Sequence, residues 1–140
     1  MSPTTVTTRI RLVVAMCLGV SFGAAGPVAA HHSFFGEFDI HQPITVTGVV
    51  TKVEWTNPHI RFYLDVTDRK GQVTRWIFLG AAAAGLVRQG VSETSLKIGE
   101  RVKVDGFRAL EGNAYASAGR VTLPGGKRLF VGPLEDPTPI

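Results

Sequence analysis

The feature that most constrains the fold of this chain is a series of short segments in which apolar and polar residues alternate. The clearest is residues 60–67, where isoleucine, phenylalanine, leucine and valine occupy every second position. An alternation with period two places the apolar side chains on one face of a β-strand. Turns rich in glycine, proline or aspartate separate this segment from further predicted strands at 44–55, 73–79, 96–106, 113–123 and 127–131. The strand at 73–79 is apolar on both faces, so we expect it to be central or covered.

One segment has a different pattern. Residues 81–89 are rich in alanine, carry Leu86 and Val87, and are followed by Gly90, which is typical of a short helix with a glycine stop. Three strands, a helix and two or three further strands match the order of the OB-fold, a small Greek-key β-barrel. The chain is therefore predicted to be mainly β, a five- to six-stranded OB-fold-like barrel with one short helix between strands three and four. A β-sandwich is the competing architecture, but it would not need the helix.

The predicted barrel spans residues 44–132, between an N-terminal arm at 31–43 and a C-terminal tail at 133–140. The arm contains three phenylalanines, whose rings we expect to pack against the domain. In the first strand the apolar positions change phase after Gly48. Because one extra residue exchanges the two faces of a strand, we predict a bulge or bend at Gly48 that lets the strand begin in one sheet and finish in another.

The first thirty residues have the organisation of a secretory signal peptide. Two arginines precede an apolar run at 12–25, which is shorter than the roughly twenty residues that a membrane-spanning helix needs. The small residues that follow predict cleavage after Ala30, whereas cleavage after Ala29 would place Pro27 unfavourably. We therefore expect a periplasmic or secreted protein that meets the membrane only during export.

Cleavage would change the chemistry of the chain. The single cysteine, Cys17, would be lost, so residues 31–140 would contain no thiol for a disulfide or a metal site. The basic count would fall from 15 to 13 against 11 acids, which lowers the net charge from +4 to +2. Lysines and arginines are scattered along the sequence, with no run longer than two. Because a nucleic-acid footprint needs a cluster or stripe, we expect no nucleic-acid partner.

Three blocks of the sequence resemble a known family: His31–Phe34 (HHSF), Thr47–His59 (TGVVTKVEWTNPH) and Leu123–Phe130 (LPGGKRLF). Together they are similar to a family of exported bacterial proteins that is catalogued as a domain of unknown function. The resemblance covers essentially all of the mature chain, and it implies a periplasmic or secreted location and a single small β domain. It implies no activity, catalytic residue or cofactor.

The predicted cleavage would create a candidate metal site. It would leave His31 as the first residue and His32 as the second, with a free α-amine whose pKa is about 8. Amine and imidazole nitrogens favour Cu(II), and His59 or His41 is a candidate further ligand. The alternative is that the paired histidines at the chain end have no biological role in metal binding. Any peptide with histidines near its N-terminus takes up copper, so copper uptake alone would not distinguish the two. His59 would then merely begin a strand after a turn.

A second candidate site lies on the polar side of residues 60–67. OB-folds commonly bind ligands on the face of strands two and three, so we predict that Arg61, Tyr63 and Asp65, with Trp55 nearby, contact a ligand. The alternative for Trp55 is packing in the core.

The sequence contains no pattern that indicates a catalytic site. Its serines lie in no nucleophile-elbow motif, and its neighbouring acidic residues have no features of a shared buried site. We therefore expect a binding module for a protein or small ligand, and the alternative is a copper-binding protein that uses its N-terminal histidines. An enzyme acting on a small substrate is a third class, because a fold does not determine a function.

Overall fold

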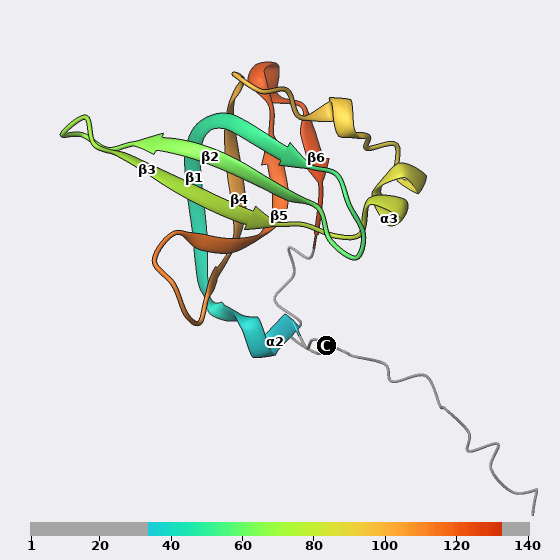
Figure 1. The fold of residues 1–140 in the computed structure, drawn as a ribbon, viewed down its shortest axis with the longest axis horizontal. Coiled ribbons are helices and arrows are strands. Elements are labelled where there is room, and N and C mark those ends of the chain that lie inside the picture. Colours follow the sequence, from blue (N-terminus) through green and yellow to red (C-terminus); the bar gives the residue numbers. More distant parts are fainter. Residues whose placement is uncertain (1–33, 133–140) are drawn as a thin grey trace, which may run out of the picture. The chain divides into compact units, whose positions relative to one another are not determined.

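The computed structural model describes residues 34–132, with side chains from Gly36 onward. The predicted leader, His31, His32 and the predicted tail lie outside this range. The described chain forms six strands and four short helical segments (Figure 1). In chain order they are α2 (Phe34–Glu37), β1 (Phe38–Glu54), β2 (Arg61–Thr67), β3 (Val73–Leu79), α3 (Ala83–Arg88), the 3₁₀ turn η1 (Glu93–Ser95), β4 (Arg101–Ala109), β5 (Tyr115–Thr122), the 3₁₀ turn η2 (Pro124–Gly126) and β6 (Arg128–Phe130).

The strands close into a barrel. They follow the order β3-β2-β1-β4-β5-β6, and a further parallel pairing between β3 and β5 joins the first five strands into a ring. In that closing pair Phe78 lies opposite Ala116, while β6 pairs with the far end of β5, where Val121 lies opposite Leu129. A ring of strands with α3 between β3 and β4 confirms the predicted OB-fold-like architecture.

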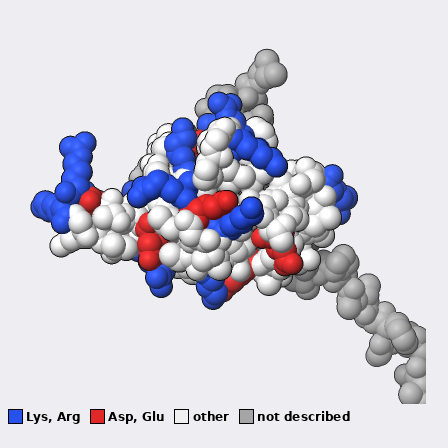
Figure 2. Space-filling model, turned by 90° about the horizontal axis from the view of Figure 1, so that it is seen from above, with Lys and Arg blue, Asp and Glu red and all other residues white. Residues whose placement is uncertain are grey.

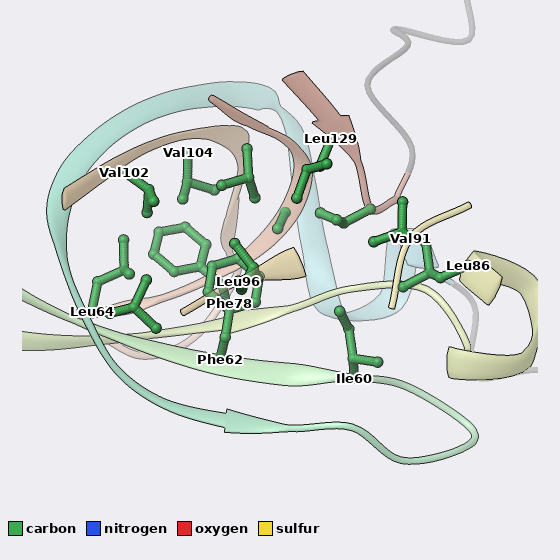
Figure 3. Packing of buried hydrophobic residues seen from close by; sticks show 14 of the residues in the cluster. Ile60, Phe62, Leu64, Phe78, Leu86, Val91, Leu96, Val102, Val104 and Leu129 are labelled. Carbon is green, nitrogen blue, oxygen red and sulfur yellow. The ribbon is translucent and has the colours of Figure 1, made fainter. Parts of the chain in front are cut away.

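The barrel interior is filled by the apolar side of each strand (Figure 3). Phe62 and Leu64 of β2 are fully buried, as the alternation predicted, and the Phe62 ring stacks on Phe78 with centroids 5.4 Å apart. Leu86 of α3 is buried at the edge of the same cluster, so the helix closes the core. Each such side chain contributes roughly 1.5–3 kcal/mol of hydrophobic stabilisation relative to an exposed one.

Strand β1 is longer than predicted. It begins at Phe38 rather than Ile44, so residues 38–43 of the predicted arm belong to the strand. Phe38 is only 2% exposed and packs with Phe107 and Ala109 in a second small cluster, as expected for an arm aromatic. The side chains of the other two arm phenylalanines lie outside the described part of the chain. The strand pairs with β4 along its first part and with β2 along its last part, but all of these strands belong to one six-stranded sheet, so the predicted passage of the first strand from one sheet to another is wrong.

The irregularity between β1 and β2 lies three residues later than predicted. Gly48 and Val50 continue the buried alternation, and the register with β2 shifts between Val50 and Lys52, at Thr51. Gly48 allows a close approach instead, because a Cβ there would lie 2.8 Å from the carbonyl oxygen of Asp65. Valines on both sides of the strand made its phase ambiguous in the sequence, so the position predicted for the bulge is wrong.

Candidate functional site

Three of the four predicted ligand-binding residues lie together on the outer face of the barrel. Arg61, Tyr63 and Asp65 alternate with the buried residues of β2, so all three point away from the core. Neighbouring strands add further polar side chains, because Lys52 lies opposite Tyr63. The same holds for Glu54 opposite Arg61 and for Arg75 opposite Asp65. We call this group the polar platform: Lys52, Glu54, Arg61, Tyr63, Asp65 and Arg75.

Tyr63 occupies the middle of the polar platform. Its hydroxyl donates a hydrogen bond of 3.2 Å to Glu54 Oε2, and the Lys52 ammonium lies 5.2 Å from its ring centre. The ring is half-buried and forms one wall of a shallow hollow that Thr51, Lys52 and Arg75 also line. The platform therefore offers an aromatic surface next to both hydrogen-bond donors and hydrogen-bond acceptors.

Two ion pairs flank Tyr63. Lys52 Nζ lies 2.5 Å from Glu54 Oε1, and this hydrogen bond lowers the pKa of Glu54 and raises the pKa of Lys52. Arg75 donates from Nε at 2.9 Å and from Nη2 at 3.3 Å to the two oxygens of Asp65, which raises the pKa of Arg75. Each of these two cations is therefore matched by an acid.

Trp55 is not part of the polar platform. It follows the last residue of β1, and it packs half-buried against the barrel core. Lys52, Glu54 and Arg75 were missed because their place beside β2 depends on strand register. Arg75 is the charged residue of 73–79, and Trp76 and Phe78 on the other face of the strand are apolar, so this part of the sequence could have indicated Arg75.

The Thr47–His59 block contains a structural clamp. The imidazole Nδ1 of His59 donates a hydrogen bond of 3.0 Å to the carbonyl oxygen of Gly80, and Asn57 Oδ1 accepts one of 3.3 Å from the N–H of Ala84 in the first turn of α3. The backbone N–H of Gly80 donates in turn to the carbonyl of Ile60. These bonds hold the β1–β2 loop against the start of the helix.

The described residues bring together no metal site. Within residues 34–132 there is no group of three or more His, Cys, Asp or Glu side chains arranged to hold an ion. His59 is exposed, and its bond to Gly80 through Nδ1 leaves Nε2 available to another partner. The other two predicted ligands, His31 and His32, lie outside the described residues. No helix in residues 34–132 has the length and apolarity to cross a membrane.

A second hollow lies where β1 departs from β4, and sequence analysis did not identify it. Its volume is about 530 Å³, and Ile40, Phe107 and Arg120 are among the residues that line it. Asp105 in its wall accepts hydrogen bonds from the Thr45 hydroxyl at 2.8 Å and from Arg120 Nε at 2.9 Å. Burial alone would raise the pKa of Asp105, but these two bonds, together with the positive charges of Arg120 and Lys103, lower the pKa.

Comparison with known proteins assigns the chain to a family. Residues 20–118, which are more than half of the chain, match the family of unknown function DUF6152. The matched region includes the His31–Phe34 and Thr47–His59 blocks and ends before Leu123–Phe130. No curated protein matches the chain. The chain therefore belongs to DUF6152, a family of unknown function.

Proposed function

We propose that this protein is an exported binding module that holds a polar ligand, a protein segment or a small molecule, on the polar platform. The observation that carries the proposal is the half-buried ring of Tyr63 in a hollow between two ion pairs. An aromatic face with hydrogen-bonding groups at its edges is typical of small-ligand and peptide sites.

The arrangement of charge favours a ligand of low net charge. Lys52 and Arg75 are each neutralised by a carboxylate, so of the three platform cations only Arg61 forms no ion pair with a described acid. A strongly charged ligand would have to break these pairs, whereas a ligand with donors and acceptors of its own can bond to both partners of each pair. Saccharides and peptide backbones have this chemistry.

The test is the double variant Arg61→Ala with Tyr63→Ala. The protein is taken as it accumulates in cells, with its first residue determined by intact mass, which also tests export and cleavage. A partner captured by the wild type is purified and titrated, and we expect its affinity to fall at least about tenfold, the effect of losing one binding hot spot.

The control is Lys103→Ala with Arg128→Ala, which removes two exposed side chains from another face. Thermal unfolding of both variants verifies that each is folded. If Arg61→Ala with Tyr63→Ala retains every partner at unchanged affinity, the polar platform is not the binding site.

Copper binding is the second candidate, and one observation favours it. The bond from Nδ1 of His59 to a backbone carbonyl fixes the ring with Nε2 free, which is the usual arrangement of a metal-ligating histidine. In this proposal the freed amine, His31 and His32 supply the remaining nitrogens. The test is a Cu(II) competition between the cellular form of the protein and a His-His-Ser peptide. We expect tighter binding by the protein and a loss of that advantage in His59→Gln, whereas equal affinity would exclude a contribution from the fold.

A further inference from the structure

Strands β4, β5 and β6 present a second outer face. Lys103 of β4 lies opposite Thr122 of β5, which in turn lies opposite Arg128 of β6. Both cations are exposed, and the residues that flank them along their strands, such as Val104 and Leu129, are buried. Lys103 and Arg128 therefore stand on one face, two strands and about 10 Å apart.

The neighbouring row across the same strands adds an aromatic ring. Asp105 lies opposite Arg120, and Arg120 lies opposite Phe130, whose side chain is 54% exposed. Asp105 is the carboxylate of these rows, and its ion pair with Arg120 at 2.9 Å satisfies it. Arg101 adds a further exposed cation two residues before Lys103 on β4. We call this group the basic face: Arg101, Lys103, Arg120, Arg128 and Phe130.

Three cations of the basic face have no matching acid. Arg101, Lys103 and Arg128 form no ion pair with a carboxylate of the described residues. Lys103 and Arg128 stand about 10 Å apart, close to the Debye length of about 10 Å at 0.1 M salt, so they repel each other weakly, whereas Lys103 attracts the carboxylate of Asp105. Figure 2 also shows that charge is distributed unevenly over the surface, with several Lys and Arg side chains gathered in the upper middle of the view.

We propose that the basic face docks on a membrane surface that carries anionic phospholipid headgroups. The cations form a two-dimensional array on a sheet, which matches an extended charged surface, whereas single-stranded nucleic acid is held in a basic groove. The exposed ring of Phe130 lies among them, and the transfer of an aromatic ring from water into the boundary between headgroups and acyl chains is favourable. The guanidinium groups of Arg101 and Arg128 suit phosphate oxygens because they donate two parallel hydrogen bonds.

The experiment measures binding to vesicles of phosphatidylcholine with and without phosphatidylglycerol. The protein is the form that accumulates in cells, so any contribution of residues before the barrel is common to all variants. We expect binding that requires phosphatidylglycerol and weakens as salt is added. Each basic residue near such a surface changes the affinity roughly fivefold, so Lys103→Gln with Arg128→Gln should weaken binding by about 30-fold.

The matched control is Arg69→Gln with Lys70→Gln, which removes the same charge from the exposed β2–β3 turn. We expect this control to bind within about twofold of the wild type, and we expect Phe130→Ser to lose several-fold in affinity. Equal loss in the two double variants would show that only net charge matters, and this would overturn the proposal. Equal binding to both vesicles would also overturn it, as would binding to heparin or single-stranded DNA without binding to vesicles.

This proposal does not rest on the polar platform. Arg61→Ala with Tyr63→Ala should leave vesicle binding unchanged, because those side chains belong to β2. The two proposals therefore succeed or fail separately.

Discussion

The polar platform and the basic face are both outer faces of one barrel, and each carries several arginine or lysine side chains. On the polar platform, Lys52 and Arg75 each contact a carboxylate on the same or the neighbouring strand. On the basic face, Lys103 and Arg128 face a threonine between them instead of an acid. Surface ion pairs contribute little to stability, so the difference concerns what each face can bind.

The net charge of the chain does not report how its charged side chains are arranged on the surface. The sequence has no basic run longer than two residues, and this led us to expect no nucleic-acid partner. Lys103 and Arg128 lie 25 positions apart in the sequence, yet strand pairing places them on adjacent parts of one face. A cluster of this kind is created by the fold.

The strongest test of the comparison damages the wall that carries the basic face. A Cβ on Gly106 would lie 1.8 Å from the carbonyl oxygen of Ser117, where the register between β4 and β5 shifts. Gly106→Ala should therefore lower the free energy of unfolding by about 3 kcal/mol or more, at the upper end of overpacking costs. Denaturant unfolding measures this. A Cβ on Gly85 in α3 would lie 3.9 Å from Arg88 Nη2, an ordinary contact, so Gly85→Ala should raise stability by up to about 1 kcal/mol, and a loss there would contradict the packing described.

A smaller effect should separate the ion pairs of the two faces. The Asp105 side chain is 16% exposed and bonds to Thr45 and Arg120, so Asp105→Asn should lower the free energy of unfolding by about 1–3 kcal/mol. Glu54→Gln breaks a more exposed pair on the polar platform and should have a smaller effect.

The pH dependence follows from the same carboxylate. Because folding lowers the pKa of Asp105, its contribution is present above about pH 4 and is lost as pH falls through the folded value. Unfolding at pH 7 and pH 3 should show a larger acid-induced loss in the wild type than in Asp105→Asn. Equal losses would mean that the Asp105 bonds contribute nothing.

The loop beside the polar platform should respond more weakly. Asn57→Ala removes the acceptor for the N–H of Ala84, so we expect a loss of about 0.5–1 kcal/mol in unfolding free energy. Asn57→Asp keeps an oxygen there and adds negative charge near a helix N-terminus, so it should retain stability. If both variants lose the same unfolding free energy, the hydrogen bond between Asn57 and the N–H of Ala84 does not account for the loss.

The smallest effects should have opposite signs on the two faces. Arg128→Gln relieves repulsion on the basic face and should raise the unfolding free energy by at most about 0.5 kcal/mol at low salt. Lys52→Gln removes the partner of Glu54 and should lower it slightly. Both changes should vanish at high salt, as measured by unfolding in a salt series. Changes of the same sign would show that the two charge arrangements do not differ in energy.

Local patterns predicted much of the fold. The alternation in residues 60–67 identified β2 and its buried side, and the alanine-rich segment before Gly90 identified α3. The start of β1 was wrong by six residues because Pro43, which lacks a backbone donor, was taken as a boundary. In the structure Pro43 pairs with β4 beside a register shift, where the loss of a donor is tolerated.

The candidate site was only half predictable. Arg61, Tyr63 and Asp65 were found because a strand's period places them on one face. Trp55 was predicted to lie near that face, with packing in the core as the alternative, and the structure packs it half-buried against the core. The other charged residues of the platform are Lys52 and Glu54 of β1 and Arg75 of β3, so they could be named only once the strand register was known.

The sequence by itself determined roughly where the strands and the helix fall and which side of β2 is buried, because these depend on short-range periodicity. Only the tertiary structure decided that β3 pairs with β5 and that Lys103 and Arg128 share one face. The reason is physical: a strand's edges can pair with any other strand, and the partner is selected by packing the whole core, to which residues far apart in the chain contribute together.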